Sequence, residues 1–443
     1  MVARRFAACL VGLGLLATGA RAQTLSAGVA QVDITPPNGL ALLGYPGEGR
    51  FATGTRDPLY ARVLVLQAGA TRFALVDLDL VFLFGPSYMA RLRETAHADV
   101  TNLLVAAIHT HSGPNPFASP SSPEDAWETA AVGAVAGAIH RAAANLVPAR
   151  LGVGYGEAFL GHNRLRVERD GSVIWFEKNW TGATAGTVDP TVAVLRVDDM
   201  GGSPIAVLVN YACHPVIYHR DSRLYSADFP GVMTGFVERA LGGKVVCFYL
   251  QGGAGNINPD HAASSLQQGA QEFCMRAGTE LGRVASGVAQ RIQTAASADP
   301  SLQVADDTVT LAPRWDAGQW RAAAPQDSKM IAEHTMAEYE LPVTTVLINR
   351  QIALVAMPGE PFVEFQMQWR ARCPVHDCLF LGYSNGSFGY FPTIRAAAWG
   401  GYGASHPSTW IEVGAGERML NHALIRVQEM LGRLGPVPED LRK

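Results

Sequence analysis

Apolar runs of strand length recur along this chain, and they constrain its fold more than any other feature. Helix-like stretches separate several of them, notably residues 123–146 and 269–293. Strands that are apolar throughout are buried on both faces. The pattern therefore predicts an α/β (mixed α+β) fold with buried mixed β-sheets flanked by helices, in a single large domain. The runs are ARVLVLQAG (61–69), RFALVDLDLVFL (72–83), NLLVAAI (102–108), PIAVLVNYA (204–212), KVVCFYL (244–250) and QIALVAMPG (351–359).

The first 22 residues have the form of a secretory signal peptide. Arg4 and Arg5 precede the apolar stretch FAACLVGLGLLATGA, which is too short to span a bilayer, and small residues lead up to Gln23. A membrane anchor is the alternative, but no stop-transfer segment follows. We therefore expect removal of residues 1–22, a mature domain over residues 23–443, and a secreted or periplasmic protein without a transmembrane anchor.

The charge balance argues against nucleic acid as a partner. The full chain has a net charge of −4, and residues 1–22 hold three arginines and no acidic residue, so the remainder carries −7. A mildly acidic surface without basic runs does not attract polyanions. A small-molecule or lipid-like substrate is the expected partner, and the sequence leaves the oligomeric state open.

Five cysteines follow the signal-like segment. An odd number in an oxidising compartment leaves at least one cysteine without a partner in its own chain. Cys373 and Cys378 flank the residues PVHD and are candidates to close a small loop. A zinc knuckle is disfavoured because no second cysteine pair has ligand spacing. The other three are Cys213, which we expect to be a buried small apolar residue, Cys247 and Cys274.

The stretch AAIHTHSGPNP (106–116) places His109 and His111 directly after an apolar run. Because side chains alternate along a strand, both imidazoles can lie on the same side of the chain. Neutral imidazole is a zinc ligand, and oxygen donors commonly complete the coordination. By itself the pattern is a weak signal, since a single histidine is more often structural or exposed. It also occurs in amidohydrolase barrels, but this chain lacks their regular strand–helix repetition.

Three more polar residues follow apolar runs in the same way. His214 comes after IAVLVNYAC, Asn256 after VVCFYLQGGAG, and Glu360 after IALVAMPG. Functional groups are often collected at strand ends, because the scaffold there is rigid and the loops are free to vary. Together with His109, these positions predict a site at one edge of a sheet.

Six short motifs occur along the chain in a fixed order: HTHSGP (109–114), NRL (163–165), CHP (213–215), GNINP (255–259), PGE (358–360) and NGSFGYFPT (385–393). Their order and spacing resemble the catalytic domain of the neutral/alkaline non-lysosomal ceramidase family. The segments AGVAQVDITPP (27–37) and GYGASHPSTWIEVGAGE (401–417) are also similar to that family. The resemblance covers nearly the whole mature chain, which implies a neutral ceramidase-like catalytic domain over residues 23–443.

The resemblance implies one zinc ion held by four side chains: His109, His214, Glu360 and Tyr390. Such a ligand set leaves the ion enough charge to lower the pKa of a bound water to about 7 and to polarise a carbonyl group. Two of the four have structural alternatives. Tyr390 also fits a buried core tyrosine, and Glu360 fits an acid at the N-terminus of the helix that follows it.

The resemblance also assigns the residues around the ion. His111 would lie beside the metal and handle a proton or stabilise an oxyanion. Arg164 would bind the carbonyl or head group of the substrate, and Tyr402 would lie near the reacting centre. Asn258 stands in GNINP where the family carries a serine that is regarded as catalytic. Its amide can still donate a hydrogen bond, but it cannot serve as an acyl-carrying nucleophile.

A second departure from the family is the end of the chain. It stops shortly after the helix-like segment 414–434, whereas ceramidases continue into a β-sandwich domain. Together with Asn258, this end predicts a substrate other than ceramide itself.

The sequence thus predicts a secreted zinc-dependent hydrolase in which zinc-activated water attacks an amide bond of a ceramide-like N-acyl compound. Ester and lactone substrates are alternatives, because they are cleaved through the same tetrahedral geometry. A catalytically silent lipid- or glycan-binding relative is another alternative, supported by Asn258. The last is a carbohydrate-directed hydrolase with an acid pair such as Glu360 and Asp228.

Overall fold

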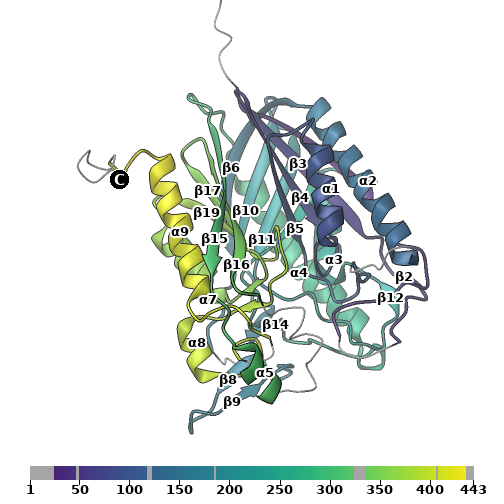
Figure 1. The fold of residues 1–443 in the computed structure, drawn as a ribbon. Helices are drawn as coiled ribbons and strands as arrows, with labels where there is room; N and C mark the ends of the chain where they lie inside the picture. The colour runs from purple at the N-terminus through teal and green to yellow at the C-terminus, as the bar shows by residue number, and fades with distance from the viewer. Residues whose placement is uncertain are drawn as a thin grey trace, which may run out of the picture.

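The computed structural model describes residues 24–45, 49–116, 122–183, 186–323, 336–405 and 408–435. Within these residues, two β-sheets pack face to face, and helices cover the outer face of each (Figure 1). The expected mixed fold of buried sheets flanked by helices is therefore confirmed. The proposed signal peptide lies outside the described residues. No helix within the described residues is long and apolar enough to cross a membrane.

The larger sheet has eight strands in the order β13-β11-β10-β6-β1-β3-β4-β5. The pairs β4–β5 and β11–β13 are parallel, and the other neighbours are antiparallel. The strands are β1 (Ser26–Asp33), β3 (Tyr60–Ala68), β4 (Thr71–Leu78), β5 (Asn102–Ala107), β6 (Val147–Glu157), β10 (Thr191–Asp199), β11 (Pro204–Tyr211) and β13 (Val246–Gln251).

Both faces of the larger sheet are buried, which explains the uninterrupted apolar runs. In β3, Val63 and Val65 pack against the helices, while Leu64 and Leu66 pack against the second sheet. Alternate side chains of a strand point to opposite faces, so each face needs its own apolar set. The covering helices are α1 (Pro86–Ala96), α2 (Pro123–Ala144), α3 (Asp228–Leu241) and α4 (Ala270–Arg291).

The second sheet has four strands in the order β15-β16-β17-β19. In β17, Leu354 faces the larger sheet, whereas Ala353 and Val355 face the helices on the other side. Its strands are β15 (Leu302–Leu311), β16 (Tyr339–Ile348), β17 (Ile352–Ala356) and β19 (Asp377–Leu381), and its helices are α7 (Val363–Arg372) and α9 (Ala415–Met430).

Short elements fill the end of the molecule where the strand-end residues lie. The apolar run 72–83 is a strand only as far as Leu78, and residues 79–83 leave the sheet as a loop. Residues 312–330 contain the short helix α5 (Ala317–Ala323), and residues 324–330 lie outside the described residues. The remaining elements are β2 (Gly54–Thr55), β7 (Gly161–Asn163), β8 (Leu165–Val167), β9 (Val173–Trp175), β12 (Leu224–Tyr225), β14 (Ile257–Pro259), β18 (Glu360–Pro361), β20 (Tyr390–Phe391), α8 (Ile394–Trp399) and η1 (Leu266–Gln268).

Candidate metal centre

The buried side chain of Gln251, at the end of β13, joins the ends of three strands. Its amide NH₂ donates to the backbone oxygens of Ile108 and Cys213, at 3.0 and 2.9 Å, and its oxygen accepts the N–H of Cys213 at 3.3 Å. Ile108 and Cys213 directly precede His109 and His214. Gln251 therefore brings two histidines together that are 105 positions apart. Our sequence analysis missed it, although a polar residue that ends an apolar run is a visible signal.

His109 and His214 are each oriented by a backbone carbonyl. The Nδ1 of His109 lies 2.7 Å from the oxygen of Val81, and the Nδ1 of His214 lies 2.7 Å from that of Ala254. An N–H at Nδ1 leaves the Nε2 of each ring with a free lone pair. His109 also has a positive φ of 72°, a conformation uncommon outside glycine that is often found at functional sites.

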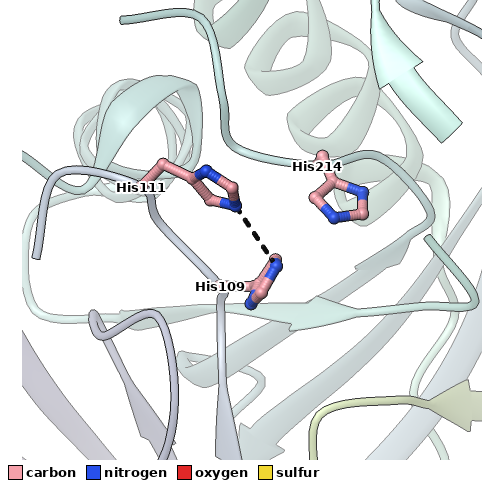
Figure 2. A group of neighbouring side chains, drawn as sticks. All are labelled: His109, His111 and His214. Carbon is pink, nitrogen blue, oxygen red and sulfur yellow. Dashed lines mark hydrogen bonds between the residues drawn. The ribbon is translucent and has the colours of Figure 1, made fainter. Parts of the chain in front are cut away.

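His111 completes a group of three histidines, drawn in Figure 2, and one ring nitrogen of each lies within 4.8 Å of one nitrogen of the other two. Its Nε2 is 3.3 Å from the Nε2 of His109, whereas its Nδ1 is buried without a hydrogen-bond partner among the described residues. The loop at Gly44 packs on this ring so closely that a Cβ there would lie 2.6 Å from the His111 Cγ. His111 is therefore held by packing, without the backbone acceptor that the other two histidines have.

Glu360 reaches the histidines from β18, the short strand that follows β17 of the second sheet. Its Oε2 lies 3.2 Å from the Nε2 of His214 and 3.5 Å from the Nε2 of His109. The hydroxyl of Tyr383 donates to the same oxygen at 3.4 Å, a contact that our sequence analysis missed. Glu360 is thus not the first-turn acid of α7, a position that Glu364 occupies. The four strand-end positions come from two sheets, not from one edge of a single sheet as expected.

The backbone turn before Glu360 requires a glycine. Gly359 has a φ of 66°, and a Cβ there would lie 2.4 Å from the oxygen of Gly389. The N–H of Glu360 donates to that same oxygen at 2.8 Å, and β18 then pairs in parallel with β20, which sets Tyr390 opposite Glu360. The motifs PGE and FGY are therefore neighbours in space.

A cavity of about 250 Å³ opens on these side chains, and Tyr390 and Tyr402 line it together with His109, His111 and Glu360. Burial raises the pKa of Tyr390 well above its usual value, and the neighbouring Arg164 opposes that shift.

Arg164 is buried among aromatic rings beside this cavity. Its guanidinium carbon lies 5.1 Å from the ring centres of Tyr390 and Tyr402 and 5.6 Å from that of Trp175. One nitrogen donates to the backbone oxygen of Gly255 at 2.5 Å. These contacts fix a permanent positive charge next to the histidines and Glu360.

Asn258, the remaining predicted site residue, directly follows Ile257, whose backbone oxygen lies 3.1 Å from the Nδ1 of His214. It lies on β14, and its amide donates to the backbone oxygen of Glu177 at 3.4 Å. Its side-chain oxygen is buried and has no hydrogen-bond partner in the described part of the chain.

The electrostatics of the site suit a bound cation. Burial lowers the pKa of His109 to about 4 and lowers the pKa values of His111 and His214 well below their usual value. All three rings are therefore neutral, and nitrogen lone pairs and a carboxylate oxygen converge on one point. Imidazole nitrogen and carboxylate oxygen form a donor set that fits zinc and other transition metals. The three histidines could hold a metal ion.

Comparison with known proteins identifies the family of this chain. The family described as neutral/alkaline non-lysosomal ceramidase, N-terminal, matches residues 25–303. The chain belongs to this family. The matched region includes His109, Arg164, His214 and Asn258, whereas Glu360 lies beyond it.

Among the curated relatives of this ceramidase-family chain is the neutral ceramidase of Pseudomonas aeruginosa, which is 29% identical over 279 residues. The alignment covers 58% of this chain, and its aligned part spans 40% of the relative's length. The crystal structure of the P. aeruginosa neutral ceramidase matches with a TM-score of 0.74 at 20% identity, over 94% of this chain and 76% of that one. A structure titled ceramidase complexed with C2 gives 0.73 at 19% identity, over 94% and 77%. These two structures show that the fold is shared.

Proposed function

We propose that this chain is a zinc-dependent hydrolase that cleaves the amide bond of a lipid-like N-acyl substrate. The observation that carries the proposal is the convergence of the Nε2 atoms of His109 and His214 on the carboxylate of Glu360. Family membership supports amide hydrolysis as the reaction class. We further propose that residues 23–443 form one catalytic domain and that the protein is secreted or periplasmic.

We propose His109, His214, Glu360 and Tyr390 as the zinc ligands. Histidines that bind metals almost always donate their other ring N–H to an oxygen acceptor. His109 and His214 do so through Val81 and Ala254. The third histidine of the cluster has no such acceptor within the described residues, which supports a role beside the ion. A bound zinc would polarise the substrate carbonyl and make water acidic enough to react near neutral pH.

The surrounding side chains supply the rest of the chemistry. We assign to His111, whose Nε2 lies 3.3 Å from that of His109, the transfer of a proton to the leaving amine. Arg164 is held against Tyr390 and Tyr402, where its guanidinium can hydrogen-bond the oxygen of the scissile carbonyl as negative charge develops there. Tyr402 is 38% exposed, and its ring lies tilted against Trp175 with the ring centres 4.0 Å apart, which suits contact with the substrate at the cavity mouth.

Ester or lactone cleavage is the second candidate. It is favoured by Asn258, which cannot act as a hydroxyl nucleophile, because esters and lactones have better leaving groups than amides and are cleaved more readily by water alone. A carbohydrate-directed acid pair is disfavoured because the carboxylate of Asp228 already accepts the backbone N–H groups of Ile217, Tyr218 and Phe229.

The test measures metal content and hydrolysis on the same protein. Metal-free protein is reloaded with zinc or magnesium and given an amide, an ester and a lactone of matched acyl length. We expect one zinc per chain and amide hydrolysis that returns with zinc but not with magnesium. Amide hydrolysis at full rate by metal-free protein would falsify the proposal. Cleavage of only the ester or lactone selects the second candidate, and no cleavage at all selects a silent binding protein. The variant His140→Ala changes an exposed histidine on α2, and we expect it to behave like the parent protein in this test.

A further inference from the structure

Two cysteines lie on either side of the turn that joins α7 to β19. Cys373 is the residue that follows the last turn of α7, and Cys378 is the second residue of β19. Cys373 is half-buried and Cys378 is buried. The pair therefore combines a thiol that solvent can reach with one that it cannot.

The backbone of this turn is anchored on several sides. The hydroxyl of Tyr155 accepts the N–H of Cys378 and donates to the carboxylate of Asp377, both at 3.3 Å. The side chain of Arg433 donates to the oxygen of Pro374 at 3.2 Å. The N–H of Cys373 donates to the oxygen of Trp369 at 2.8 Å. These contacts hold the two cysteines at a fixed separation.

The sulfur of Cys378 points back into the turn between the two cysteines, where it lies 3.1 Å from the oxygen of Val375. Hydrogen bonding with the other thiol lowers the pKa of Cys373 and raises the pKa of Cys378. A half-buried thiol with a lowered pKa is the form that attacks an oxidant. Burial instead raises the pKa values of the other three described cysteines, Cys213, Cys247 and Cys274.

We propose that Cys373 and Cys378 form an intramolecular disulfide that clamps the turn between α7 and β19. The bond would tie together the two elements that lead into the carboxylate side of the candidate metal centre, because α7 starts just after Glu360 and β19 ends just before Tyr383. The proposal does not depend on the proposed function, since thiol state and stability are measured without substrate or metal.

The oxidant in this proposal is a small-molecule disulfide such as oxidised glutathione. The Cys373 thiolate attacks one sulfur of the oxidant and releases one glutathione thiolate. The Cys378 thiolate then attacks the Cys373 sulfur of the mixed disulfide and releases the second. Two protein thiols are oxidised, the oxidant is reduced to two thiols, and two protons pass to the released thiolates or to water.

The experiment equilibrates the folded full chain with oxidised glutathione, unfolds it and alkylates the remaining thiols. Trypsin releases residues 373–395 as one peptide that carries both cysteines, because no lysine or arginine lies between Arg372 and Arg395. We expect this peptide to escape alkylation and to be lighter by two hydrogens than its reduced form. The oxidised protein should also melt about 2–4 °C higher than protein reduced with dithiothreitol.

Cysteine variants test whether the change in melting temperature comes from this pair rather than from the other thiols. In Cys373→Ala and in Cys378→Ala the difference in melting temperature between oxidised and reduced protein should disappear. In Cys247→Ala, which removes a buried thiol outside the pair, the difference should remain. Two alkylated cysteines in the peptide, a stable glutathione adduct on Cys373, or a difference that persists in both single variants would each overturn the proposal.

Discussion

The candidate metal centre joins two regions that hold their side chains in different ways. The histidine side comes from the larger sheet, where His109 and His214 follow strand ends and donate to backbone carbonyls. The carboxylate side comes from β18, which follows β17 of the second sheet, and there Glu360 depends on the turn at Gly359 and on the hydroxyl of Tyr383. The histidine side is therefore fixed by main-chain acceptors, while the carboxylate side is fixed by loops. We expect the first to keep its geometry without metal and the second to adjust when metal binds.

The largest effect should come from breaking the histidine side. His214→Ala removes an imidazole that has no solvent exposure and whose Nε2 faces Glu360. Loss of a direct ligand should weaken metal binding by more than about 100-fold, the upper end of what loss of a supporting residue costs. Equilibrium dialysis with metal analysis measures the affinity, and His140→Ala is the control. Unchanged affinity in His214→Ala would remove this residue from the ligand set.

Glu360→Gln tests the carboxylate side while keeping its shape. The amide oxygen can still face the histidines, but the negative charge is lost, so we expect metal affinity to fall by about 10- to 100-fold. Glu364→Gln is the matched control, because Glu364 is the next acid along the chain and instead accepts a hydrogen bond from Asn256. If Glu360→Gln binds metal as tightly as the parent, the histidines alone hold the ion and the two sides do not share it.

Gln251→Leu tests how far the histidine side depends on its support. The change leaves the oxygen of Ile108 and the N–H of Cys213 buried without this partner, while the Tyr249 hydroxyl still donates to the oxygen of Cys213. We expect a loss of about 2–4 kcal/mol in the free energy of unfolding of the metal-free protein, together with about 10-fold weaker metal binding. Urea unfolding and metal titration measure the two. Gln67→Leu, near the far end of β3, should change stability by less than about 0.5 kcal/mol. Equal effects of the two substitutions would show that Gln251 has no special role.

The smallest effect concerns a carboxyl group behind the histidine side. Asp57 accepts hydrogen bonds from Ser226 Oγ and the Ala227 N–H, and the oxygen of Ser226 accepts the hydroxyl of Thr110, which lies between the two histidines of the HTH motif. Burial raises the pKa of Asp57 from 3.8 to about 6. The folded protein therefore binds more protons than the unfolded chain between about pH 4 and 6, so its stability falls as the pH rises through that window.

The measurement compares the parent with Asp57→Asn, which keeps a neutral group of the same shape. We expect the parent to lose about 1–3 kcal/mol relative to the variant between pH 4 and pH 7, from the size of the pKa shift. Groups common to both proteins cancel in this difference. Parallel stability curves over that range would show that Asp57 titrates normally and that the loop behind Thr110 does not depend on its protonation.

The sequence by itself determined the fold class and most of the residues at the site. The apolar runs predict strands buried on both faces, because a strand with no polar alternation has no face for water. The position of His109 and His214 directly after apolar runs also places them at strand ends. The family motifs add Glu360, Tyr390, Arg164 and Tyr402. These are properties of short segments, which can be recognised from the sequence without coordinates.

Only the tertiary structure decided which residues meet. Glu360 comes from a different sheet than the histidines, and nothing in the local pattern says that the ends of two sheets converge. Gln251 contacts residues that are 38 and 143 positions away, and Tyr383 contacts Glu360, which is 23 positions away. Their roles therefore appear only when the chain is folded. Asn258 is a further case, since only the fold shows that its amide donates to the backbone oxygen of Glu177. The physical reason is that side-chain direction and long-range packing follow from the whole set of contacts rather than from neighbours in the sequence.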